Sequence, residues 1–382
     1  MLVRILRAPR GSFFLLGPRG TGKTTWLKRR FPEAYRIDLL DERLYMAYQA
    51  DPGLLSDELS AVPAGRRVVI DEIQRVPVLL NEVHRQIEEK GRLFALCGSS
   101  ARKLKRASTN LLAGRAVRRQ MHGFVPAELG GAFRIDRQLR YGCLPLVWSA
   151  EDPADVLDAY VDMYLKEEIR AEAAVRNLPG FARFLPLAAL FHGQALNVSS
   201  LARDAGVART TVEGYLGILE DTLLAFRLPA FSSRLRVRER RHPKLFLFDP
   251  GVVRALAKRR GAPTRDQVGH LFEGWIAELL RSYRSYRSIF DDWYYWSPAG
   301  ARRTEVDFLL ERDGELVAIE VKKTGSTSPR NLVGLRAIAE LPGLRRRILL
   351  YLGSVRLETE DGIDVLRLED FLAELENGTL FP

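Results

Sequence analysis

Short apolar runs recur through the first hundred positions of the chain, and each ends in glycine or in polar residues. Such runs favour buried strands, whereas the segments between them favour helices. We therefore predict strands at residues 13–16, 35–40, 67–72 and 93–100, and a helix that opens at Lys23. Strands that alternate with helices predict an α/β fold with a parallel sheet.

The first predicted strand leads into a glycine-rich loop and then into the helix. The sequence G-P-R-G-T-G-K-T fits G-x-x-x-x-G-K-[ST] between a strand and a helix. Backbone N–H groups of such a loop surround phosphate oxygens, and the helix N-terminus adds positive charge. We expect Lys23 to reach the β- and γ-phosphates of ATP and Thr24 to bind Mg²⁺. The predicted ATP-binding residues of this loop are Gly17, Pro18, Arg19, Gly20, Thr21, Gly22, Lys23, Thr24 and Thr25.

Acidic and polar residues end two further strands. Asp71 is predicted to hold Mg²⁺ through water, and Glu72 to orient and activate the attacking water. An acidic pair that caps the next helix is the alternative. Ser99 and Ser100 end another strand, where ligands of open α/β sheets bind, so they are candidates for sensing the γ-phosphate. Capping of the following helix is equally compatible with these serines.

Helical patterns continue through the middle of the chain at residues 155–174, 181–191, 200–205 and 208–219. We interpret Pro179-Gly180 as a break between parts of the chain. The last two helices, separated by a turn at Gly206, predict a helix-turn-helix. The outward-facing residues that begin its second helix, where base edges are met, are Arg209, Thr210 and Thr211.

A basic segment follows these helices. Arg234, Arg236 and Arg238 alternate, so on a strand they would share one face. A β-wing with this face would lie along DNA phosphates, and we expect backbone binding more than sequence-specific readout. Two alternatives stay open: a winged helix used for packing or oligomerisation, or a solvated charged face. Residues 281–288 interleave arginine with tyrosine, which suits either base stacking or a helix end with arginine stems on apolar surface.

Two strands near the C-terminal end flank an Asp-Gly dipeptide at 313–314, a strong hairpin sequence. With the turn at this dipeptide, Asp307 falls opposite Glu320, and Glu305 falls opposite Lys322 on the same face. Facing carboxylates repel, so this arrangement predicts a cation between them, and oxygen ligands suit Mg²⁺ or Mn²⁺. Lys322 would orient water or balance charge as a phosphodiester is attacked. A surface hairpin with ion pairs such as Glu305 with Lys322 is the alternative.

Composition narrows the partners. The 382 residues carry a net charge of +11, which favours a polyanion such as DNA, although a general arginine bias would give the same number. Two cysteines provide neither a disulfide framework nor a zinc site, and we expect a reducing, cytoplasmic setting. We find no secretory signal, no run of transmembrane length and no basic amphipathic helix, so we expect no membrane partner.

Four motifs together resemble a family of bacterial and archaeal AAA-type ATPases that carry a C-terminal domain of unknown function. These motifs are residues 17–24, 69–72, 98–100 and 111–115. The resemblance implies a five-stranded parallel sheet between helices, and assembly into a homo-oligomer, with a hexamer among the forms it allows. It also implies that Arg115 reaches the γ-phosphate of a neighbouring subunit. A surface arginine or a DNA-backbone contact is the alternative for Arg115.

Asp307 with Glu320-Val321-Lys322 resembles the signature of PD-(D/E)xK restriction-endonuclease-like nucleases. The usual proline before the aspartate is replaced by Val306. The resemblance implies that Glu273, on a preceding helix, is a further metal ligand beside Asp307 and Glu320. It also implies branched or structure-specific DNA as substrate. A folded domain of this type without activity is the alternative.

These predictions combine into an α/β multidomain protein. We predict an AAA-type P-loop core at residues 1–125, a helical lid at 126–179, a winged helix-turn-helix at 180–245 and a restriction-endonuclease-like domain at 246–382. The leading hypothesis is an ATP-dependent DNA-processing protein with a Mg²⁺- or Mn²⁺-dependent nuclease domain. The alternative is an ATP-gated protein that binds DNA or a partner through an inert nuclease fold.

Overall fold

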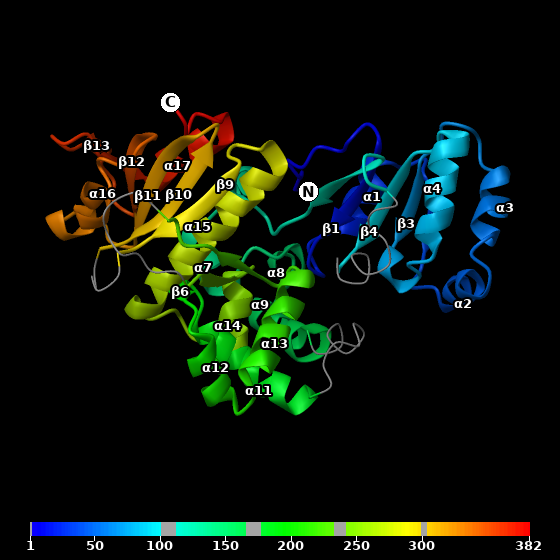
Figure 1. Ribbon diagram of the computed structural model, residues 1–382, viewed down its shortest axis with the longest axis horizontal. Helices are drawn as coiled ribbons and strands as arrows, with labels where there is room; N and C mark the ends of the chain where they lie inside the picture. Colours follow the sequence, from blue (N-terminus) through cyan, green and yellow to red (C-terminus); the bar gives the residue numbers. More distant parts are fainter. Residues whose placement is uncertain (1, 101–111, 166–176, 233–241, 299–303) are drawn as a thin grey trace. The chain divides into compact units, whose positions relative to one another are not determined.

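The computed structural model describes residues 2–100, 112–165, 177–232, 242–298 and 304–382 (Figure 1). They form two compact units, each assembled from segments distant in sequence. The first unit comprises Met1–Phe124, Leu144–Arg176 and Gly214–Leu224, and the second comprises Val125–Cys143, Asn177–Glu213 and Ala225–Pro382. The predicted division into four domains stays a prediction.

A five-stranded parallel sheet forms the centre of the first unit (Figure 1). Its strand order is β2-β3-β4-β1-β5. The strands are β1 (Ser12–Leu16), β2 (Tyr35–Asp38), β3 (Val68–Asp71), β4 (Phe94–Gly98) and β5 (Ala116–Gln120). The four strands predicted in the first hundred residues and the parallel sheet are confirmed. Since β1, β4 and β3 are neighbours, the loops after them meet at one edge of the sheet.

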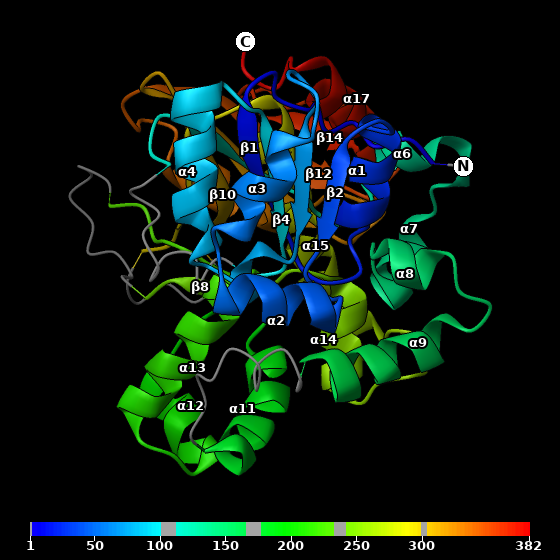
Figure 2. The same ribbon diagram turned by 90° about the vertical axis from the view of Figure 1, so that its right-hand side faces the viewer.

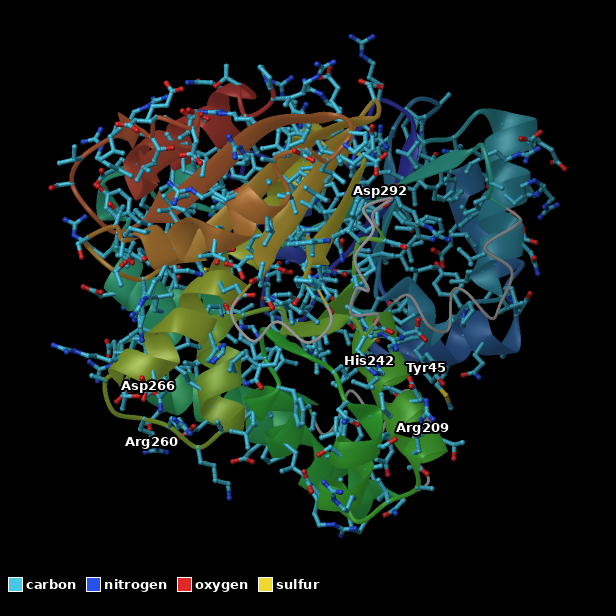
Figure 3. All side chains as sticks on the ribbon, turned by 60° about the vertical axis from the view of Figure 1, so that its left-hand side comes forward. Tyr45, Arg209, His242, Arg260, Asp266 and Asp292 are labelled. Atoms are coloured by element: carbon cyan, nitrogen blue, oxygen red, sulfur yellow. The ribbon has the colours of Figure 1, made fainter. Side chains whose placement is uncertain are left out.

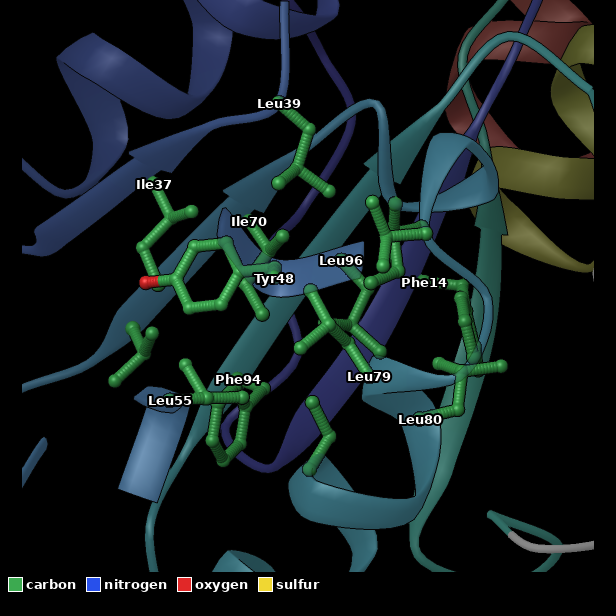
Figure 4. Close-up of a cluster of buried hydrophobic side chains, with 14 of the residues drawn as sticks. Phe14, Ile37, Leu39, Tyr48, Leu55, Ile70, Leu79, Leu80, Phe94 and Leu96 are labelled. Carbon is green, nitrogen blue, oxygen red and sulfur yellow. The ribbon is translucent and has the colours of Figure 1, made fainter. Parts of the chain in front are cut away.

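Helices cover both faces of this sheet. They are α1 (Lys23–Arg30), α2 (Glu42–Ala50), α3 (Leu54–Ser60), the short η1 (Ile73–Arg75) and α4 (Leu79–Lys90). Alternate strand residues point to opposite faces, so Phe14, Ile70 and Leu96 pack with side chains of α2, α3 and α4 (Figure 4). On the other face, the rings of Phe13 and Trp26 lie 6.3 Å apart. Each such buried side chain stabilises the fold by about 1.5–3 kcal/mol.

The first unit continues after the sheet with α8 (Pro145–Trp148), α9 (Pro153–Ala159) and the π-helical turn η3 (Tyr160–Leu165). The helix predicted at 155–174 is present in its described part, where α9 continues directly into the π-helical turn. Residues 166–174 of that prediction lie outside the described residues.

A six-stranded sheet forms the centre of the second unit, with the order β13-β14-β12-β11-β10-β9. The strands are β9 (Asp292–Trp296), β10 (Val306–Arg312), β11 (Glu315–Lys322), β12 (Leu344–Tyr351), β13 (Leu357–Glu358) and β14 (Asp364–Arg367). The accompanying helices are α15 (Arg265–Arg287), η4 (Pro329–Leu332), α16 (Val333–Ala337) and α17 (Leu368–Asn377).

The hairpin of β10 and β11 turns at Asp313 and Gly314. Their φ angles of 53° and 80° are those of a two-residue hairpin turn. The pairing runs from Arg312 opposite Glu315 to Phe308 opposite Ile319. The predicted register is therefore confirmed. One residue further from the turn along each strand, it places Asp307 and Glu320 on a shared face.

The remainder of the second unit is a helical layer with a small sheet. Its helices are α6 (Pro126–Leu129), η2 (Gly130–Ala132), α7 (Ile135–Tyr141), α11 (Leu178–Leu190), α12 (Val198–Ala205), the first residues of α13 (Arg209–Asp221) and α14 (Pro250–Leu256). The sheet has the order β6-β8-β7, with β6 (Gln194–Ala195), β8 (Lys244–Leu247) and β7 (Ala225–Leu228). Helices α11 and α12 lie side by side (Figure 2).

The predicted break at Pro179-Gly180 lies close to the division between the two units, which falls between Arg176 and Asn177. Pro179 and Gly180 lie in the first turn of α11, which Asn177 caps through its side chain. Proline is tolerated there because the N–H groups of a first turn have no partner within the helix. The helices predicted at 200–205 and 208–219 are present, while their assignment to a winged helix stays a prediction. The predicted wing arginines Arg234, Arg236 and Arg238 lie outside the described residues.

None of the described helices is both long and apolar enough to cross a membrane.

Candidate functional site

The glycine-rich loop lies at the carboxyl end of β1 and holds its own lysine. The ammonium group of Lys23 is buried and donates to the carbonyl oxygens of Gly17 at 2.7 Å and Pro18 at 3.1 Å. Gly20 and Gly22 have φ angles of 81° and 85°, which glycine adopts without strain. The loop therefore has the backbone conformation and the buried cation that phosphate binding needs.

The two predicted Mg²⁺ ligands meet at this edge. The hydroxyl of Thr24 donates to Oδ2 of Asp71 at 2.6 Å, and Asp71 is 7% exposed. Both groups offer oxygen atoms, the ligand type that Mg²⁺ prefers. The donor set therefore fits the ion that the sequence predicted here.

Glu72 is held by polar neighbours that the sequence analysis did not connect to it. It has a left-handed conformation, with φ of 56°, which is uncommon outside glycine. Its Oε2 accepts hydrogen bonds from Nε2 of Gln74 and, at 3.4 Å, from the hydroxyl of Ser99. Nε2 of Gln74 also donates to Ser99 at 3.1 Å. The structure thus brings Ser99 to the acidic end of β3, while Ser100 is fully buried and the helix it was predicted to cap lies outside the described residues.

A cavity of about 1170 Å³ adjoins the loop within the first unit. Its lining includes the loop, Glu72, residues of the N-terminal segment 2–8, Phe124 and residues of α8. Arg4 fixes this wall, because its guanidinium donates to the carbonyl oxygens of Thr21, His122 and Gly123. The cavity is large enough for a nucleotide, and its wall is partly apolar.

Residues that follow β5 in sequence also contact the phosphate loop. The hydroxyl of Tyr160 donates to the carbonyl oxygen of Arg19 at 3.1 Å, and the N–H of Leu146 donates to that of Gly20 at 3.4 Å. Part of the predicted lid therefore contacts the phosphate loop directly.

Among the described residues of the first unit, Arg115 does not contact the phosphate loop or the acidic end of β3. Its side chain is 37% exposed and pairs with Glu88. The structure leaves it accessible, and its predicted role toward a neighbouring subunit stays a prediction.

In the second unit, the hairpin brings the predicted acidic pair together. Asp307 and Glu320 are 5% and 6% exposed and occupy one face. Oδ2 of Asp307 accepts from the N–H of Val321 at 2.9 Å and lies 3.9 Å from Nζ of Lys322, which also pairs with Oε1 of Glu320. Oε2 of Glu320 is buried without a hydrogen-bond partner, a loss that costs about 1–3 kcal/mol.

A second lysine, from β8, enters the same cluster. Nζ of Lys244 lies 2.7 Å from Oε1 of Glu273 and 3.3 Å from Oδ1 of Asp307, and it also pairs with Oε1 of Glu305. The carboxylates of Glu273, Glu305 and Asp307 each offer one oxygen within 4.8 Å of the others, close enough to hold a metal ion. The alternative of a surface hairpin paired Glu305 with Lys322, whereas in the structure Glu305 pairs with Lys244.

Burial and neighbouring charges shift the pKa values of these groups in different directions. Burial lowers the pKa of Lys244, but the carboxylates of Glu273, Asp307 and Glu305 outweigh it and raise that pKa well above its ordinary value. Burial raises the pKa of Glu273 to about 8 in spite of Lys244. Burial and the charge of Asp307 raise the pKa of Glu320 well above its ordinary value, whereas Lys322 and Lys244 overcome burial and lower the pKa of Asp307. Perturbation of this kind is frequent at functional sites.

The predicted nucleic-acid residues are placed in part. Arg209 is exposed at the start of α13 (Figure 3). Thr210 is also exposed, and Thr211 is partly buried. In the basic segment 281–288, the Arg281 guanidinium lies over the ring of Phe226 at 4.7 Å and Tyr283 is 1% exposed. These contacts favour arginine stems on apolar surface over base stacking for that segment.

Sequence reasoning missed Arg4, Gln74 and Lys244. Arg4 and Gln74 lack a sequence pattern that would have identified them. Lys244 precedes the apolar residues 245–248, so a single charge at the start of a buried strand was the available signal.

Three families match successive parts of the chain. An AAA domain family matches residues 10–129, which contain the parallel sheet, the phosphate loop and the acidic end of β3. Two families described as domains of unknown function, DUF8612 and DUF4143, match residues 133–262 and 268–371. The first match and the site geometry support an AAA-type P-loop domain in residues 10–129, as the motifs predicted.

Two relatives found by sequence carry the name uncharacterized protein. The chain is 28% identical over 370 residues to an uncharacterized protein of Mycobacterium tuberculosis, covering 94% of this chain and 80% of that protein. An uncharacterized protein of Haemophilus influenzae is 23% identical over 325 residues, covering 80% and 77%. Among solved structures, the Aeropyrum pernix ORC1 protein in complex with DNA matches at 15% identity and a TM-score of 0.26, covering 66% of this chain and 87% of that one. A structural similarity this low does not inform function.

Proposed function

We propose that the first unit binds ATP with Mg²⁺ and hydrolyses it. The observation that carries this proposal is the 2.6 Å contact between Thr24 and Asp71, because it joins two motifs that are 47 residues apart into one oxygen-lined site. The AAA domain match to residues 10–129 supports the same function.

Each residue at this edge has a role in the proposal. Lys23 exchanges its carbonyl partners for β- and γ-phosphate oxygens, and Thr24 and Asp71 hold the Mg²⁺ ion. Glu72 orients the attacking water, and Gln74 and Ser99 fix the direction of its carboxylate. The cavity beside the N-terminal segment receives the base and ribose.

Two substitutions test this assignment. Lys23→Ala removes the phosphate-binding cation, and Glu72→Gln removes the base while it keeps the shape. We expect Lys23→Ala to lose nucleotide affinity, and Glu72→Gln to bind ATP but to turn it over about 10²–10⁴-fold more slowly. Lys28→Ala, an exposed lysine in the same helix, is the matched control. ATP turnover that persists in both variants would remove the assigned site.

A second candidate function is metal-dependent cleavage of DNA by the second unit. It is supported by the shared face of Asp307, Glu320 and Lys322, whose oxygen donors and lysine suit Mg²⁺ or Mn²⁺ chemistry on a phosphodiester. The alternative is an inert nuclease fold in a protein whose ATP site gates binding of DNA or a partner. The close pairing of Lys244 with three of the carboxylates favours this alternative.

Cleavage assays separate these two functions. Flapped, forked and four-way DNA are incubated with Mg²⁺ or Mn²⁺ and wild type, Asp307→Ala, Glu315→Gln or Lys244→Met. Glu315 lies at the start of β11 and pairs with Arg345, so Glu315→Gln controls for a lost surface charge. Cleavage that Asp307→Ala abolishes and Glu315→Gln retains supports the nuclease, and absence of cleavage on every substrate, by wild type and by Lys244→Met, supports the inert fold.

DNA and a second copy of the chain are the proposed partners. The net charge of +11 and the exposed Arg209 support a DNA-backbone contact, whose affinity should fall steeply with salt. Arg115 is accessible for a contact with the nucleotide of a neighbouring subunit in a homo-oligomer, including a hexamer. Mixing Arg115→Ala with Lys23→Ala subunits tests this role, because shared sites would restore part of the turnover that each variant lacks.

A further inference from the structure

We propose that the ammonium group of Lys244 is a built-in cation that excludes divalent metal from the carboxylate cluster of the second unit. This inference rests on the proposed metal site at Asp307 and adds a means of regulating it. The ammonium bonds Oε1 of Glu273, Oε1 of Glu305 and Oδ1 of Asp307. One ammonium group is thus paired with three carboxylates, and it donates hydrogen bonds to Glu273 and Asp307.

The same oxygens cannot serve both cations at once. Mg²⁺ and related ions bind carboxylate oxygens at about 2.0–2.6 Å, whereas Nζ of Lys244 already lies 2.7 Å from Glu273 and 3.3 Å from Asp307. A metal held by these oxygens would therefore lie against the ammonium group, at a separation that charge repulsion forbids. Metal binding requires the lysine side chain to withdraw.

The cluster nevertheless keeps the features of a metal site. One oxygen from each of Glu273, Glu305 and Asp307 lies within 4.8 Å of the others. Independently, Glu320 is 6% exposed, and its Oε2 has no hydrogen-bond partner among the described residues. Glu320 shares the Lys322 ammonium group with Asp307, so its unpartnered oxygen lies beside the cluster and points to a ligand for this site.

The backbone holds Lys244 in this position. Strand β8 is the middle strand of its sheet, with Lys244 opposite Ala195 on one side and Leu228 on the other. The ammonium also lies 5.3 Å from the centre of the Tyr295 ring. Because the strand is paired on both sides, exchange of ammonium for metal is a movement of the side chain.

Mn²⁺ binding to the full-length protein without nucleotide tests the exclusion. Free Mn²⁺ is measured by electron paramagnetic resonance with wild type, Lys244→Met and Lys244→Met/Asp307→Ala. We expect Lys244→Met to gain one Mn²⁺ site, at least about tenfold tighter than any in wild type, and the added Asp307→Ala to remove it. We also expect Mn²⁺ to raise the melting temperature of Lys244→Met but not that of Lys244→Met/Asp307→Ala.

A charge-matched variant covers the case in which Lys244→Met does not fold. Lys244→Met/Glu305→Gln removes one positive and one negative charge, keeps Glu273 and Asp307 as ligands, and should gain the same site. Wild type that binds Mn²⁺ as tightly as the folded Lys244 variants, in a manner lost with Asp307→Ala, would overturn the exclusion and leave the metal site standing. Folded variants that all fail to bind Mn²⁺ would overturn both.

Discussion

The hydroxyl of Thr24 lies 2.6 Å from Oδ2 of Asp71, which joins the start of α1 to the end of β3. The contact depends on sheet order, since β1 and β3 are both neighbours of β4. Parallel strands in this order bring the phosphate loop and the acidic strand end to one edge. The position of the proposed Mg²⁺ site is thus set by topology as much as by motif.

Thr24→Ala removes the hydroxyl and leaves Asp71 without this partner. Because the proposed Mg²⁺ ion loses a ligand, we expect kcat for ATP to fall about 10²-fold or more and the Mg²⁺ concentration for half-maximal turnover to rise. Steady-state turnover as a function of Mg²⁺ measures both. Thr24→Ser keeps the hydroxyl and should stay within a few-fold of wild type, and an Ala variant with the Mg²⁺ dependence of wild type would contradict the assignment.

Ser99→Ala tests how the direction of the Glu72 carboxylate is fixed. Ser99 accepts from Gln74 at 3.1 Å and donates to Glu72 at 3.4 Å, so its loss loosens the carboxylate without touching the phosphate loop. We expect kcat to fall about fivefold, as for the loss of one hydrogen bond near 1 kcal/mol, while KM changes little. Ser99→Thr is the control that keeps the hydroxyl. A rise in KM at unchanged kcat would instead indicate a role in binding.

Local chemistry explains what the sequence predicted well. The phosphate loop is a continuous motif between its own strand and helix, and the hairpin register follows from Asp313 and Gly314, whose φ angles suit a two-residue turn. Asp307 and Glu320 then lie on one face by counting alone, since side chains alternate along a strand. Both predictions needed information from fewer than about twenty neighbouring residues.

Features that depend on long-range packing could not be predicted from the sequence. Lys244 is 29 residues from Glu273 and 63 from Asp307, so its place in the cluster depends on how β8 and α15 pack against the hairpin. Its neighbours in sequence suggested a basic surface segment instead. The break proposed at Pro179-Gly180 falls just inside α11, next to the division between the units at Asn177, because proline is tolerated in the first turn of a helix although it disrupts the interior.

Because His192 is buried, we predict that the folded protein loses stability toward unfolding in acid. It is 3% exposed, its Nδ1 accepts from the N–H of Leu247 at 3.0 Å, and burial together with His270 lowers its pKa from 6.5 to about 3. The folded protein thus binds fewer protons at His192 than the unfolded chain does between these values. Its contribution is fully present above pH 6.5 and is lost as the pH falls toward 3, by a total on the order of 5 kcal/mol.

His192→Asn is the comparison that isolates this effect. The amide oxygen of asparagine can replace Nδ1 as an acceptor, but the side chain does not titrate. Denaturant unfolding at pH 7, 6, 5 and 4 should show wild type losing its advantage over the variant step by step. A constant difference in the free energy of unfolding across this range would show that His192 is not held neutral.

From the hydrogen bonds of Arg4, we predict that the N-terminal segment controls the affinity for nucleotide. Its guanidinium donates to the carbonyl oxygen of Thr21 inside the phosphate loop and to that of Gly123 at the end of the first segment of the unit, each at 3.2 Å. Arg4→Ala releases the N-terminal segment from one wall of the cavity. ATP binding must then order this segment, and the entropic cost of ordering lowers the affinity for ATP. We expect KM for ATP to rise about tenfold, near the 1.4 kcal/mol of one charged hydrogen bond, with kcat within a few-fold of wild type.

Arg4→Lys and Arg7→Ala are the matched variants for this prediction. Lysine keeps the charge but lacks the planar fork, so it should recover only part of the affinity. Arg7 also lines the cavity and should matter less if the hydrogen bonds of Arg4 carry the effect. Equal increases in KM for Arg4→Ala and Arg7→Ala would point to the positive charge of the wall, and a fall in kcat for Arg4→Ala would place the segment in the hydrolysis step.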